Sequence, residues 1–448
     1  MNVFWIMLDS LRRDHIGAYG STVCKTPNLD RFAQEAVVFD NAYPEALPTI
    51  PVRTAMVTGC RTLQGRPWQP LAKEDVTVAE ILRHHGYTNV MITDTYHMAK
   101  PGMNFHRGFH SFQFIRGQEG DALELAPHDK NLEDYLHPQQ SERKRRVIDN
   151  FLRNTRRWKL EEDTFPAQVF REAARMAEGV QDRDRLFFWV DSFDPHEPWN
   201  PPAPYDTMYT DPDYKGKRLI DANYGSVDYL SGEELTYLRA MYAGEVTLVD
   251  RWFGYFMDTL RSSGLMDRSV VIVLADHGHP HGDHGLIMKS PENMYNELLR
   301  IPLMIRLPNA ERAGQRVAPL VQTDDLLPTT LDLVGLGHEA VCMTGKSAWK
   351  LVTGEVESLR DVVITGYHQS PFRCIRDTEW SLIVNPEGKH ELYHLLDDPK
   401  EQNNLFETRK DVAKSLMDRL GFFSFTKLPP DHIGNIQELY EWAHTPVE

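Results

Sequence analysis

The sequence predicts an α/β fold with a large, mainly parallel central sheet flanked by helices, followed by a smaller C-terminal α+β domain that contains a short antiparallel sheet. Short apolar runs rich in Val, Ile, Phe and Trp recur through the first 275 residues, and helical patterns lie between them. Such alternation is typical of α/β proteins, and runs without polar alternation are typical of strands buried on both faces. After about Gly354 the pattern changes to short strands. We therefore expect a catalytic domain over residues 1–350 and a smaller domain over 351–448.

Each of the four predicted strands of the sheet ends in an acidic residue. These strands are residues 3–8 before Asp9, 89–93 before Asp94, 186–190 before Asp191, and 269–275 before Asp276. A single Asp in this position could simply cap the next helix. Four of them favour a shared site instead, because ligands of such sheets gather beyond the carboxyl ends of the strands.

The remaining elements follow from periodicity and composition. Helices are predicted over residues 28–36, 77–85 and 165–178, and within 231–262. Residues 194–228 are rich in Pro, Asp and Tyr and indicate a long surface loop. In the smaller domain we expect strands over 361–365, 372–376, 380–384 and 391–394, then a helix over 410–420. We expect the aromatic tail after Gly421 to pack on the body or on a second copy in a homo-oligomer.

Composition excludes several classes of partner. The 448 residues include 49 basic and 65 acidic side chains, a net charge of −16, which disfavours nucleic acid and anionic lipid. No apolar stretch approaches the roughly 20 residues that span a membrane, and the start lacks a signal peptide. The four cysteines show no metal-binding spacing, which favours reduced thiols in a cytoplasmic protein. A small anionic substrate would need a metal ion and placed basic residues to reverse the local charge.

The densest set of candidate ligands lies in residues 275–285, Ala-Asp-His-Gly-His-Pro-His-Gly-Asp-His-Gly. Four imidazoles and two carboxylates in eleven residues favour a site for Mn²⁺ or Zn²⁺. Asp276 and His277 come directly at the end of a predicted strand, and the glycines allow tight turns after them. A lone histidine would more often be structural, but this cluster is typical of a metal or catalytic site.

A candidate nucleophile lies in residues 47–56, Leu-Pro-Thr-Ile-Pro-Val-Arg-Thr-Ala-Met. Pro51 suits the first turn of a helix, which places Thr49 near the helix start, where the amides and the dipole favour an anion. Arg53 falls one turn further and can fork onto an oxyanion. Taken alone, Thr49 could equally be a capping residue.

Together these segments resemble the sulfatase family of the alkaline phosphatase superfamily. The matching segments are 25–31 (Lys-Thr-Pro-Asn-Leu-Asp-Arg), 41–43 (Asn-Ala-Tyr), 49–53 on a Cys-x-Pro-x-Arg signature, 194–198 (Asp-Pro-His-x-Pro), 276–285 with Lys289 downstream, and 392–405 (Leu-Tyr-x-Leu-x-x-Asp-Pro-x-Glu-x-x-Asn-Leu). They cover nearly the whole chain in order. The resemblance implies an alkaline phosphatase-like fold and a hydrolase of sulfate or phosphate esters.

The resemblance also implies roles for individual residues. Asp9, Asp276 and His277 would bind one divalent metal ion, and the Thr49 oxygen would complete its shell. Arg53 would orient the nucleophile, His196 and Lys289 would hold the substrate oxyanion, and His284 would protonate the leaving oxygen. His97 aligns with the histidine of a Gly-Lys-Trp-His segment of the family. A two-metal version would recruit Asp194, His196 and His284.

Four departures from the family pattern refine the expected chemistry. Sulfatases carry Cys or Ser at position 49 and oxidise it to formylglycine, but the methyl group of Thr49 prevents oxidation to an aldehyde, so Thr49 would act as an unmodified alcohol. Ser10 stands where sulfatases usually have a second Asp, and His277 stands where many have Asn, which favours Mn²⁺ or Zn²⁺ over Ca²⁺. Thr95 replaces a Lys that helps bind a dianionic sulfate-monoester transition state, so its loss suits a less charged substrate.

These departures resemble phosphonate monoester hydrolases and phosphodiesterases most closely. The expected function is hydrolysis of phosphodiesters or phosphonate monoesters, with Thr49 as the nucleophile. Three alternatives stay open: a sulfate-ester hydrolase that acts through Thr49, a phosphoryl or headgroup transferase, and a non-catalytic relative that binds an anionic ligand.

Overall fold

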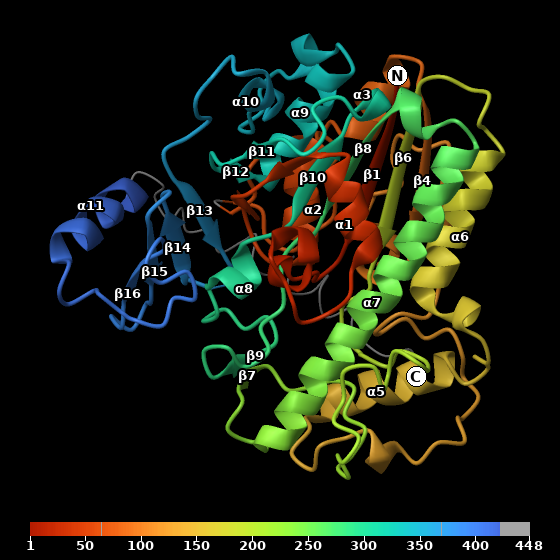
Figure 1. Ribbon diagram of the computed structural model, residues 1–448, viewed down its shortest axis with the longest axis vertical. Coiled ribbons are helices and arrows are strands. Elements are labelled where there is room, and N and C mark those ends of the chain that lie inside the picture. Colours follow the sequence, from red (N-terminus) through yellow and green to blue (C-terminus); the bar gives the residue numbers. More distant parts are fainter. Residues whose placement is uncertain (64, 369, 422–448) are drawn as a thin grey trace.

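In the computed structural model, which describes residues 1–63, 65–368 and 370–421, a mixed sheet of eight strands forms the centre of the molecule (Figure 1). The strand order is β11 (Arg316–Val317), β2 (Val37–Phe39), β10 (Leu303–Arg306), β8 (Ser269–Leu274), β1 (Asn2–Leu8), β6 (Leu186–Ser192), β4 (Thr88–Thr93) and β5 (Ser111–Phe114). Only β10 runs antiparallel to its neighbours. The predicted α/β class with a mainly parallel sheet is confirmed.

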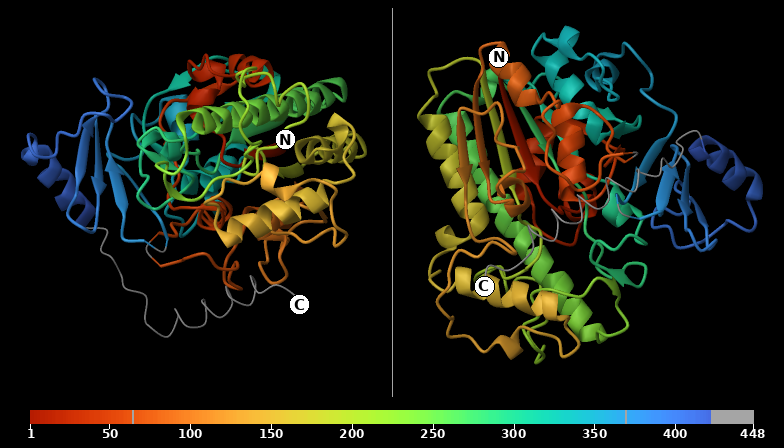
Figure 2. Two further views of the ribbon diagram at one scale, coloured as in Figure 1. Left: turned by 90° about the horizontal axis from the view of Figure 1, so that it is seen from below. Right: turned by 180° about the vertical axis from the view of Figure 1, so that it is seen from behind.

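Helices cover both faces of this sheet (Figure 2). One face carries α1 (Pro27–Gln34), α6 (Phe165–Glu178) and α7 (Gly232–Ser262), and the other carries α2 (Thr49–Thr58), α3 (Val78–His84) and α9 (Leu326–Leu333). The remaining helices are α4 (Tyr96–Ala99), α5 (Glu142–Asn154), α8 (Asn296–Leu299) and α10 (Trp349–Thr353). No helix in the described part of the chain is both long and apolar enough to cross a bilayer.

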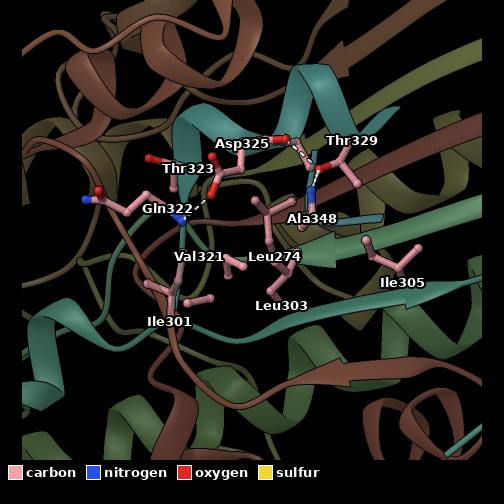
Figure 3. Close-up of a pocket in the computed structure, with 12 residues that line it drawn as sticks. Leu274, Ile301, Leu303, Ile305, Val321, Gln322, Thr323, Asp325, Thr329 and Ala348 are labelled. Carbon is pink, nitrogen blue, oxygen red and sulfur yellow. Dashed lines mark hydrogen bonds between the residues drawn. The ribbon is translucent and has the colours of Figure 1, made fainter. Parts of the chain in front are cut away.

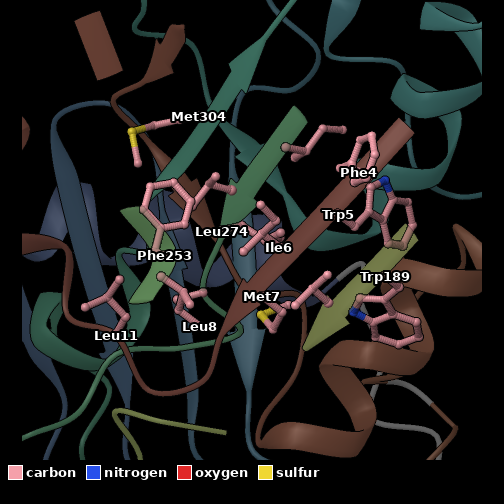
Figure 4. Close-up of a cluster of buried hydrophobic side chains, with 14 of the residues drawn as sticks. Phe4, Trp5, Ile6, Met7, Leu8, Leu11, Trp189, Phe253, Leu274 and Met304 are labelled. Atoms are coloured by element: carbon pink, nitrogen blue, oxygen red, sulfur yellow. The ribbon is translucent and has the colours of Figure 1, made fainter. Parts of the chain in front are cut away.

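The central strand β1 shows why these runs are uniformly apolar. Phe4 points to one face and meets Phe256 of α7 with ring centroids 6.2 Å apart. Trp5 points to the opposite face, where its Nε1 donates to Thr330 of α9 at 3.1 Å. Figure 4 shows Trp5 beside Trp189 of β6 in the same buried cluster. A polar residue on either face would lose its hydration, so the strand alternates between two apolar surroundings.

The C-terminal part forms a separate four-stranded antiparallel sheet, as the sequence predicts. Its strands are β13 (Val363–Gly366), β14 (Arg373–Arg376), β15 (Trp380–Val384) and β16 (Glu391–His394), and α11 (Lys410–Gly421) follows. Ile375 and Leu382 pack against Leu416 of α11 on one face. Cys374 and Ile383 face the body formed around the large sheet on the other. The aromatic tail after Gly421 lies outside the described residues.

Two short two-stranded ladders complete the fold: β3 (Ala42–Tyr43) with β12 (Val321–Gln322), and β7 (Gly225–Ser226) with β9 (Leu286–Ile287). The second ladder ties the long 194–228 loop to the segment that follows β8. Both segments carry candidate site residues, so this ladder helps to fix one against the other.

Candidate active site

Three side chains from the ends of two neighbouring strands form a compact cluster. Asp9 follows β1, and Asp276 and His277 follow β8, which pairs with β1 in parallel. Their ligand atoms all lie within 4.8 Å of one another, and each residue is fully buried. Within the described ranges this is the only such group of three His, Cys, Asp or Glu side chains, so Asp194, His196 and His284 do not form a second one.

His277 presents a free ring nitrogen to this cluster. Its Nδ1 lies 2.8 Å from the Gly278 carbonyl, an arrangement in which Nδ1 carries the proton and donates. That leaves Nε2 as a buried acceptor, 3.5 Å from an oxygen of Asp276 and with no hydrogen-bond partner among the residues described. A buried polar atom without a partner indicates that a ligand binds there. In metal-binding histidines the second ring nitrogen commonly donates to a backbone carbonyl, as His277 Nδ1 does to Gly278.

Gly278 lets this segment approach the body of the protein closely. Its amide donates to the Leu298 carbonyl at 2.8 Å, and a Cβ at this position would lie 2.0 Å from the Glu297 carbonyl oxygen. Only glycine fits there. Gly282 and Gly285 adopt positive φ in the turns that follow, as the sequence predicts.

Arg53 of α2 ties the cluster together. Its guanidinium lies 2.9 Å from Asp9, 2.9 Å from Asp191 and 2.7 Å from Asp276, and all four side chains are buried. Three carboxylates surround one guanidinium, and when all three are ionised they carry two more charges than Arg53 supplies, at positions that are fully buried. A divalent cation beside Asp9, Asp276 and His277 would restore neutrality, so the residues present fit such an ion.

The two carboxylates of the cluster titrate differently. Burial, and then the charge of Asp276, raise the pKa of Asp9 well above its usual range. Burial also acts to raise the pKa of Asp276, but His277 and Arg53 outweigh it, and this pKa is lowered. One carboxylate is thus strongly ionised, and the other ionises only when further positive charge is nearby.

Thr49 is the first residue of α2 and is 3 % exposed. The N-cap position belongs to Pro48, which makes no side-chain capping bond, so the Thr49 hydroxyl is not the helix cap. Arg53 reaches both the Thr49 carbonyl, at 3.4 Å, and Asp276. The structure therefore brings the start of α2 to the acidic cluster through one side chain.

Lys289 and His196 form a second group around the carboxylate of Glu197. Lys289 Nζ lies 2.9 Å from His196 Nε2 and 2.8 Å from Glu197. His196 Nδ1 lies 2.7 Å from the Glu197 carbonyl, so Nδ1 donates there and Nε2 accepts from Lys289. Burial lowers the pKa of His196 well below its usual range, which keeps the ring neutral. Burial opposes the charge of Lys289 as well, but Glu197 outweighs it and raises the pKa of the lysine.

His97 of α4 is linked to this group through Phe193. The Phe193 ring stacks on His196 with centroids 3.9 Å apart, and its centroid lies 6.0 Å from that of His97. A carboxylate oxygen of Glu119 lies 2.6 Å from His97 Nε2. Burial lowers the pKa of His97, although the charge of Glu119 opposes this.

The structure does not bring His284 to these groups. Its Nδ1 pairs with Glu297 at 2.7 Å, and its Nε2 lies 3.0 Å from the carbonyls of both Lys400 and Glu401. The ring stacks on Tyr295, with centroids 3.6 Å apart. Glycine turns at 282 and 285 carry the chain away from the cluster, so proximity in sequence to His277 does not become proximity in space.

Several residues of the site were not among the sequence-based candidates. Asp191 holds Arg53, and Thr95, in place of the family lysine, donates to Asp191 at 2.5 Å. Glu197 also contacts His279, at 3.1 Å. Asp191 was visible as the acid that ends a predicted strand. Glu197 occupies the unspecified position of the Asp-Pro-His-x-Pro segment, so no sequence pattern indicated its role.

The fourth strand-ending acid, Asp94, supports the site indirectly. It accepts from the Phe193 amide at 2.6 Å and from Gln118 at 3.2 Å. Gln118 also donates to Asp194, at 3.1 Å. Asp94 therefore fixes the backbone that carries Phe193 and His196, and it does not join the cluster of Asp9 and Asp276.

The C-terminal sheet borders the segment that leads into Thr49. Leu47, two residues before Thr49, pairs with Tyr367, and its amide donates to the Gly366 carbonyl at 2.9 Å. His368 Nδ1 lies 3.0 Å from the Leu47 carbonyl, and the His368 ring lies 6.2 Å from that of Trp68. His368 therefore lies beside the segment that leads into Thr49.

A small apolar cavity elsewhere in the fold is not part of this site (Figure 3). It is lined mainly by Leu274, Ile301, Leu303 and Ile305, and its volume of about 20 Å³ holds one water molecule at most. None of the candidate site residues lines it. It is a packing void between β8, β10 and α9.

Comparison with known proteins gives consistent matches over most of the chain. The sulfatase family model matches residues 1–336, and a model of the C-terminal part of N-sulphoglucosamine sulphohydrolase matches residues 282–423. An arylsulfatase of Clostridium perfringens is 26 % identical over 451 residues, which cover 91 % of each chain. The multifunctional alkaline phosphatase superfamily protein PehA of Trinickia caryophylli is 28 % identical over 389 residues, 75 % of this chain and 74 % of the relative.

Solved structures show the same fold. The phosphonate monoester hydrolase of Agrobacterium radiobacter superposes with a TM-score of 0.73 at 22 % identity, covering 94 % of this chain and 95 % of the other. A phosphonate monoester hydrolase from Silicibacter pomeroyi gives a TM-score of 0.71 at 21 % identity, with 94 % of each chain covered.

Proposed function

The chain belongs to the sulfatase family of the alkaline phosphatase superfamily, enzymes that hydrolyse sulfate or phosphate esters, and within it we propose a metal-dependent hydrolase of phosphodiesters or phosphonate monoesters. Thr49 is the proposed nucleophile, in unmodified form. The observation that carries the proposal is the buried cluster of Asp9, Asp276 and His277, joined by Arg53 to the helix that begins at Thr49.

The proposed cofactor is one divalent ion, Mn²⁺ or Zn²⁺ rather than Ca²⁺. Two carboxylates and an imidazole, with the Thr49 oxygen as a fourth donor, form a mixed oxygen and nitrogen set that suits these ions better than Ca²⁺, which prefers six or more oxygens. When bound, the ion lowers the pKa of an adjacent hydroxyl and so favours a nucleophilic threonine.

The protein's own residues supply the remaining parts of the proposed reaction. The Thr49 oxygen attacks phosphorus, the bond to the leaving oxygen breaks, and water later hydrolyses the Thr49 ester. Lys289 and the neutral His196 face the charge that gathers on the non-bridging oxygens. With both nitrogens of His284 engaged elsewhere, we assign protonation of the leaving oxygen to the pair of Lys289 and His196.

The charge of the site supports a singly charged ester. A phosphodiester or phosphonate monoester carries one negative charge, whereas a phosphate monoester carries up to two. Thr95 stands where the family uses a lysine, and its hydroxyl is already bonded to Asp191. Removing that cation weakens the binding of a second negative charge more than the binding of the first. The multifunctional relative, 28 % identical, is compatible with this assignment.

Substrate assays with matched variants test the proposal. Purified protein loaded with Mn²⁺, Zn²⁺ or Ca²⁺ is assayed on bis-aryl phosphate, aryl phosphonate, aryl phosphate and aryl sulfate esters. The first two should be hydrolysed fastest, and with Mn²⁺ or Zn²⁺. Thr49→Ala should abolish turnover, while Thr49→Ser, which keeps the hydroxyl, retains measurable activity. Full activity in Thr49→Ala would exclude this nucleophile.

A sulfate-ester hydrolase acting through Thr49 is the second candidate. The arylsulfatase relative, which matches over 91 % of each chain, favours it. The same panel separates the two, because this candidate predicts preference for the aryl sulfate over both phosphorus esters. Loss of that activity in Thr49→Ala would then assign the same nucleophile to a different substrate.

A further inference from the structure

A second and much larger cavity lies beside the segment that follows β8 and its cluster residues Asp276 and His277. Its volume is about 1170 Å³, and its walls come from residues 12–23, 236–243, 281–284, 296–300 and 399–402, with Tyr209. Of the residues assigned to the ester-hydrolysing site by sequence, only His284 lines it. This volume exceeds that of most small-molecule pockets, so it accommodates a ligand considerably larger than one ester group.

The residues that line the cavity carry more positive than negative charges, opposite to the chain as a whole. Five Arg or Lys residues and three Asp or Glu residues line it, although acids outnumber bases over the whole chain, 65 to 49. The three acids are moreover engaged within the wall. Asp14 and Asp283 clamp Arg12 at 2.6 and 2.8 Å, and Glu297 pairs with His284. The cations that remain to face a ligand are Arg13, Arg239, Arg300 and Lys400.

The Arg13 guanidinium lacks a close carboxylate partner, although part of it is buried. Its guanidinium stacks 4.2 Å above the Tyr19 ring, and its Nε is buried with no hydrogen-bond partner among the described residues. The nearest carboxylate, Asp40, is 3.8 Å away. Burial, and then the charge of Arg300, lower the pKa of Arg13 to about 10. The Arg13 side chain is partly buried, and a poorly paired guanidinium beside a second one is destabilising unless an anion joins them.

Asp40 does not serve as that anion. It is already bonded directly to Arg316, and its backbone carbonyl, rather than its carboxylate, accepts from Arg300 Nε at 3.0 Å. In the described part of the chain, the Nη atoms of Arg300 have no partner. Arg13 thus has only a long contact with a carboxylate that Arg316 already binds, and Arg300 reaches only the backbone of the same residue.

A buried histidine marks a second unsatisfied position on the same wall. His281 is 2 % exposed, and neither ring nitrogen has a hydrogen-bond partner among the residues the structure describes. Its ring packs 4.4 Å from Tyr242 and 4.9 Å from Trp199, and its carbonyl accepts from Arg239 Nε at 2.8 Å. Both Arg239 and His281 line the cavity, so polar groups without partners are spread along it.

We propose that this cavity binds a small, multiply charged oxyanion ligand, with one sulfate-, phosphate- or carboxylate-like group between Arg13 and Arg300 and further negative charge toward Arg239 and Lys400. Arginine forks match the geometry of such groups, and each charge-assisted contact strengthens binding about tenfold or more. The site is separate from the cluster of Asp9, Asp276 and His277, and it does not depend on the reaction proposed above.

Direct binding measurements test this site. Isothermal titration is carried out on the full chain carrying Lys289→Met, in the presence of a chelator, so that the ester-hydrolysing site contributes neither its metal ion nor its lysine. The probes are tripolyphosphate, inorganic phosphate and sulfate. We expect one tripolyphosphate per chain, bound at least about tenfold more tightly than either simple anion because it spans several cations. Arg13→Gln and Arg300→Gln should each weaken binding by about tenfold or more.

Arg31→Gln is the control. Arg31 pairs with Asp258 at the surface and does not line the cavity, so this change should leave the affinity within about threefold. The inference is overturned if the probes fail to bind at about 10 mM, or if the double variant Arg13→Gln/Arg300→Gln binds as tightly as its parent. It is also overturned if binding seen with wild-type protein vanishes with Lys289→Met alone. Arg13→Lys keeps the positive charge but removes the two-point hydrogen bonding of the guanidinium, so it isolates the contribution of that geometry. Thermal melting of each variant shows whether the protein is still folded.

Discussion

At the scale of single residues, the site contains a buried atom that has no partner among the residues the structure describes. This atom is His277 Nε2, while Nδ1 of the same ring is fixed by the Gly278 carbonyl. Three carboxylates surround the single guanidinium of Arg53. Both arrangements are energetically costly, and the proposed cation would relieve them.

This arrangement predicts one bound metal ion per chain, lost on replacement of His277. His277→Ala removes the unpaired nitrogen and should weaken Mn²⁺ or Zn²⁺ binding by about 100-fold or more, with little change in the stability of the metal-free protein. Metal analysis after dialysis and thermal melting with and without chelator measure both quantities. His338→Gln, at an exposed histidine, is the control. Two equivalents of metal in the wild type would contradict the single-ion proposal.

His284 provides a pH-dependent contribution to stability. Burial acts to lower its pKa, but Glu297 and the nearby Glu401 outweigh it and raise the pKa to about 9. The folded state therefore holds a proton that the unfolded state releases near pH 6.5. The resulting stability is fully present below pH 6.5 and is lost as the pH rises through about 9.

His284→Gln should remove this dependence. Relative to the wild type, the variant should be destabilised by on the order of 2 kcal/mol more at pH 6 than at pH 9.5, because only the wild type loses a charged pair over that interval. Urea unfolding at the two pH values measures the difference. His284→Gln should retain catalytic activity at pH 7. Loss of turnover in a variant that is still folded would show that His284 takes part in catalysis.

At the scale of elements, helix α1 is capped by another helix rather than by its own sequence. Its N-cap residue Thr26 makes no side-chain capping bond. Instead Asp250 of α7 accepts from the Leu29 amide at 2.7 Å and from the Asn28 amide at 3.1 Å. Asp250 is 1 % exposed, and this contact joins two helices that lie on the same face of the sheet.

Asp250→Ala should therefore destabilise the fold by about 2 kcal/mol, because it leaves buried amides without an acceptor. Asp258→Ala is the matched control, since Asp258 also lies on α7 and pairs with Arg31 of α1, but at the surface, and it should cost less than about 1 kcal/mol. Urea unfolding of both variants measures the difference. Equal effects would show that the buried cap adds nothing beyond a surface contact.

The pH dependence of Asp250 adds a second test with a definite sign. Burial raises the pKa of Asp250 to about 6, although the amides of Leu29 and Asn28 oppose this. Its folded pKa exceeds the unfolded value, so ionisation between about pH 4 and 6 disfavours folding. The stability difference between wild type and Asp250→Ala should consequently be larger at pH 4 than at pH 7.

Strands and long helices were predictable because their patterns are local. The run at 186–190 appears as β6, and the 231–262 pattern appears as α7. The four-residue strands β10 and β5 were not predicted, although β16, of the same length, was. At the site, the convergence of Asp9 with Asp276 followed from parallel strand ends. The position of His284, which pairs with Glu297, could not be predicted in this way, because it depends on the direction that the chain takes after the turns at Gly282 and Gly285.

At the scale of the whole molecule, the C-terminal sheet and the catalytic body share a core. Tyr43, Leu47 and Leu298 of the body pack with Cys374 and Ile383 of the sheet. Because Leu47 leads into Thr49, the position of the proposed nucleophile depends on this contact. The sequence indicated a second unit but not its attachment, which joins residues more than 300 positions apart in the chain.

A buried ionic network anchors this attachment. Arg376 of β14 pairs with Glu401 at 2.9 Å, donates to the Met294 carbonyl at 2.9 Å and contacts the Asn296 side chain. Glu401 in turn accepts from the Asn296 amide at 2.6 Å. Both charged side chains are nearly inaccessible, so removing one leaves the other buried and unpaired.

Arg376→Met should therefore cost about 3–5 kcal/mol, whereas Arg376→Met/Glu401→Gln should recover part of that loss, because the second change removes the stranded charge. Arg409→Gln, which disrupts a surface pair with Asp411, should cost less than about 1 kcal/mol. Urea unfolding followed by fluorescence should show one transition for the wild type, since the shared core links both units. Because α2 begins beside this interface, Arg376→Met should also lower turnover in protein that is still folded. A separate early transition with unchanged turnover would mean that the sheet folds independently and does not position Thr49.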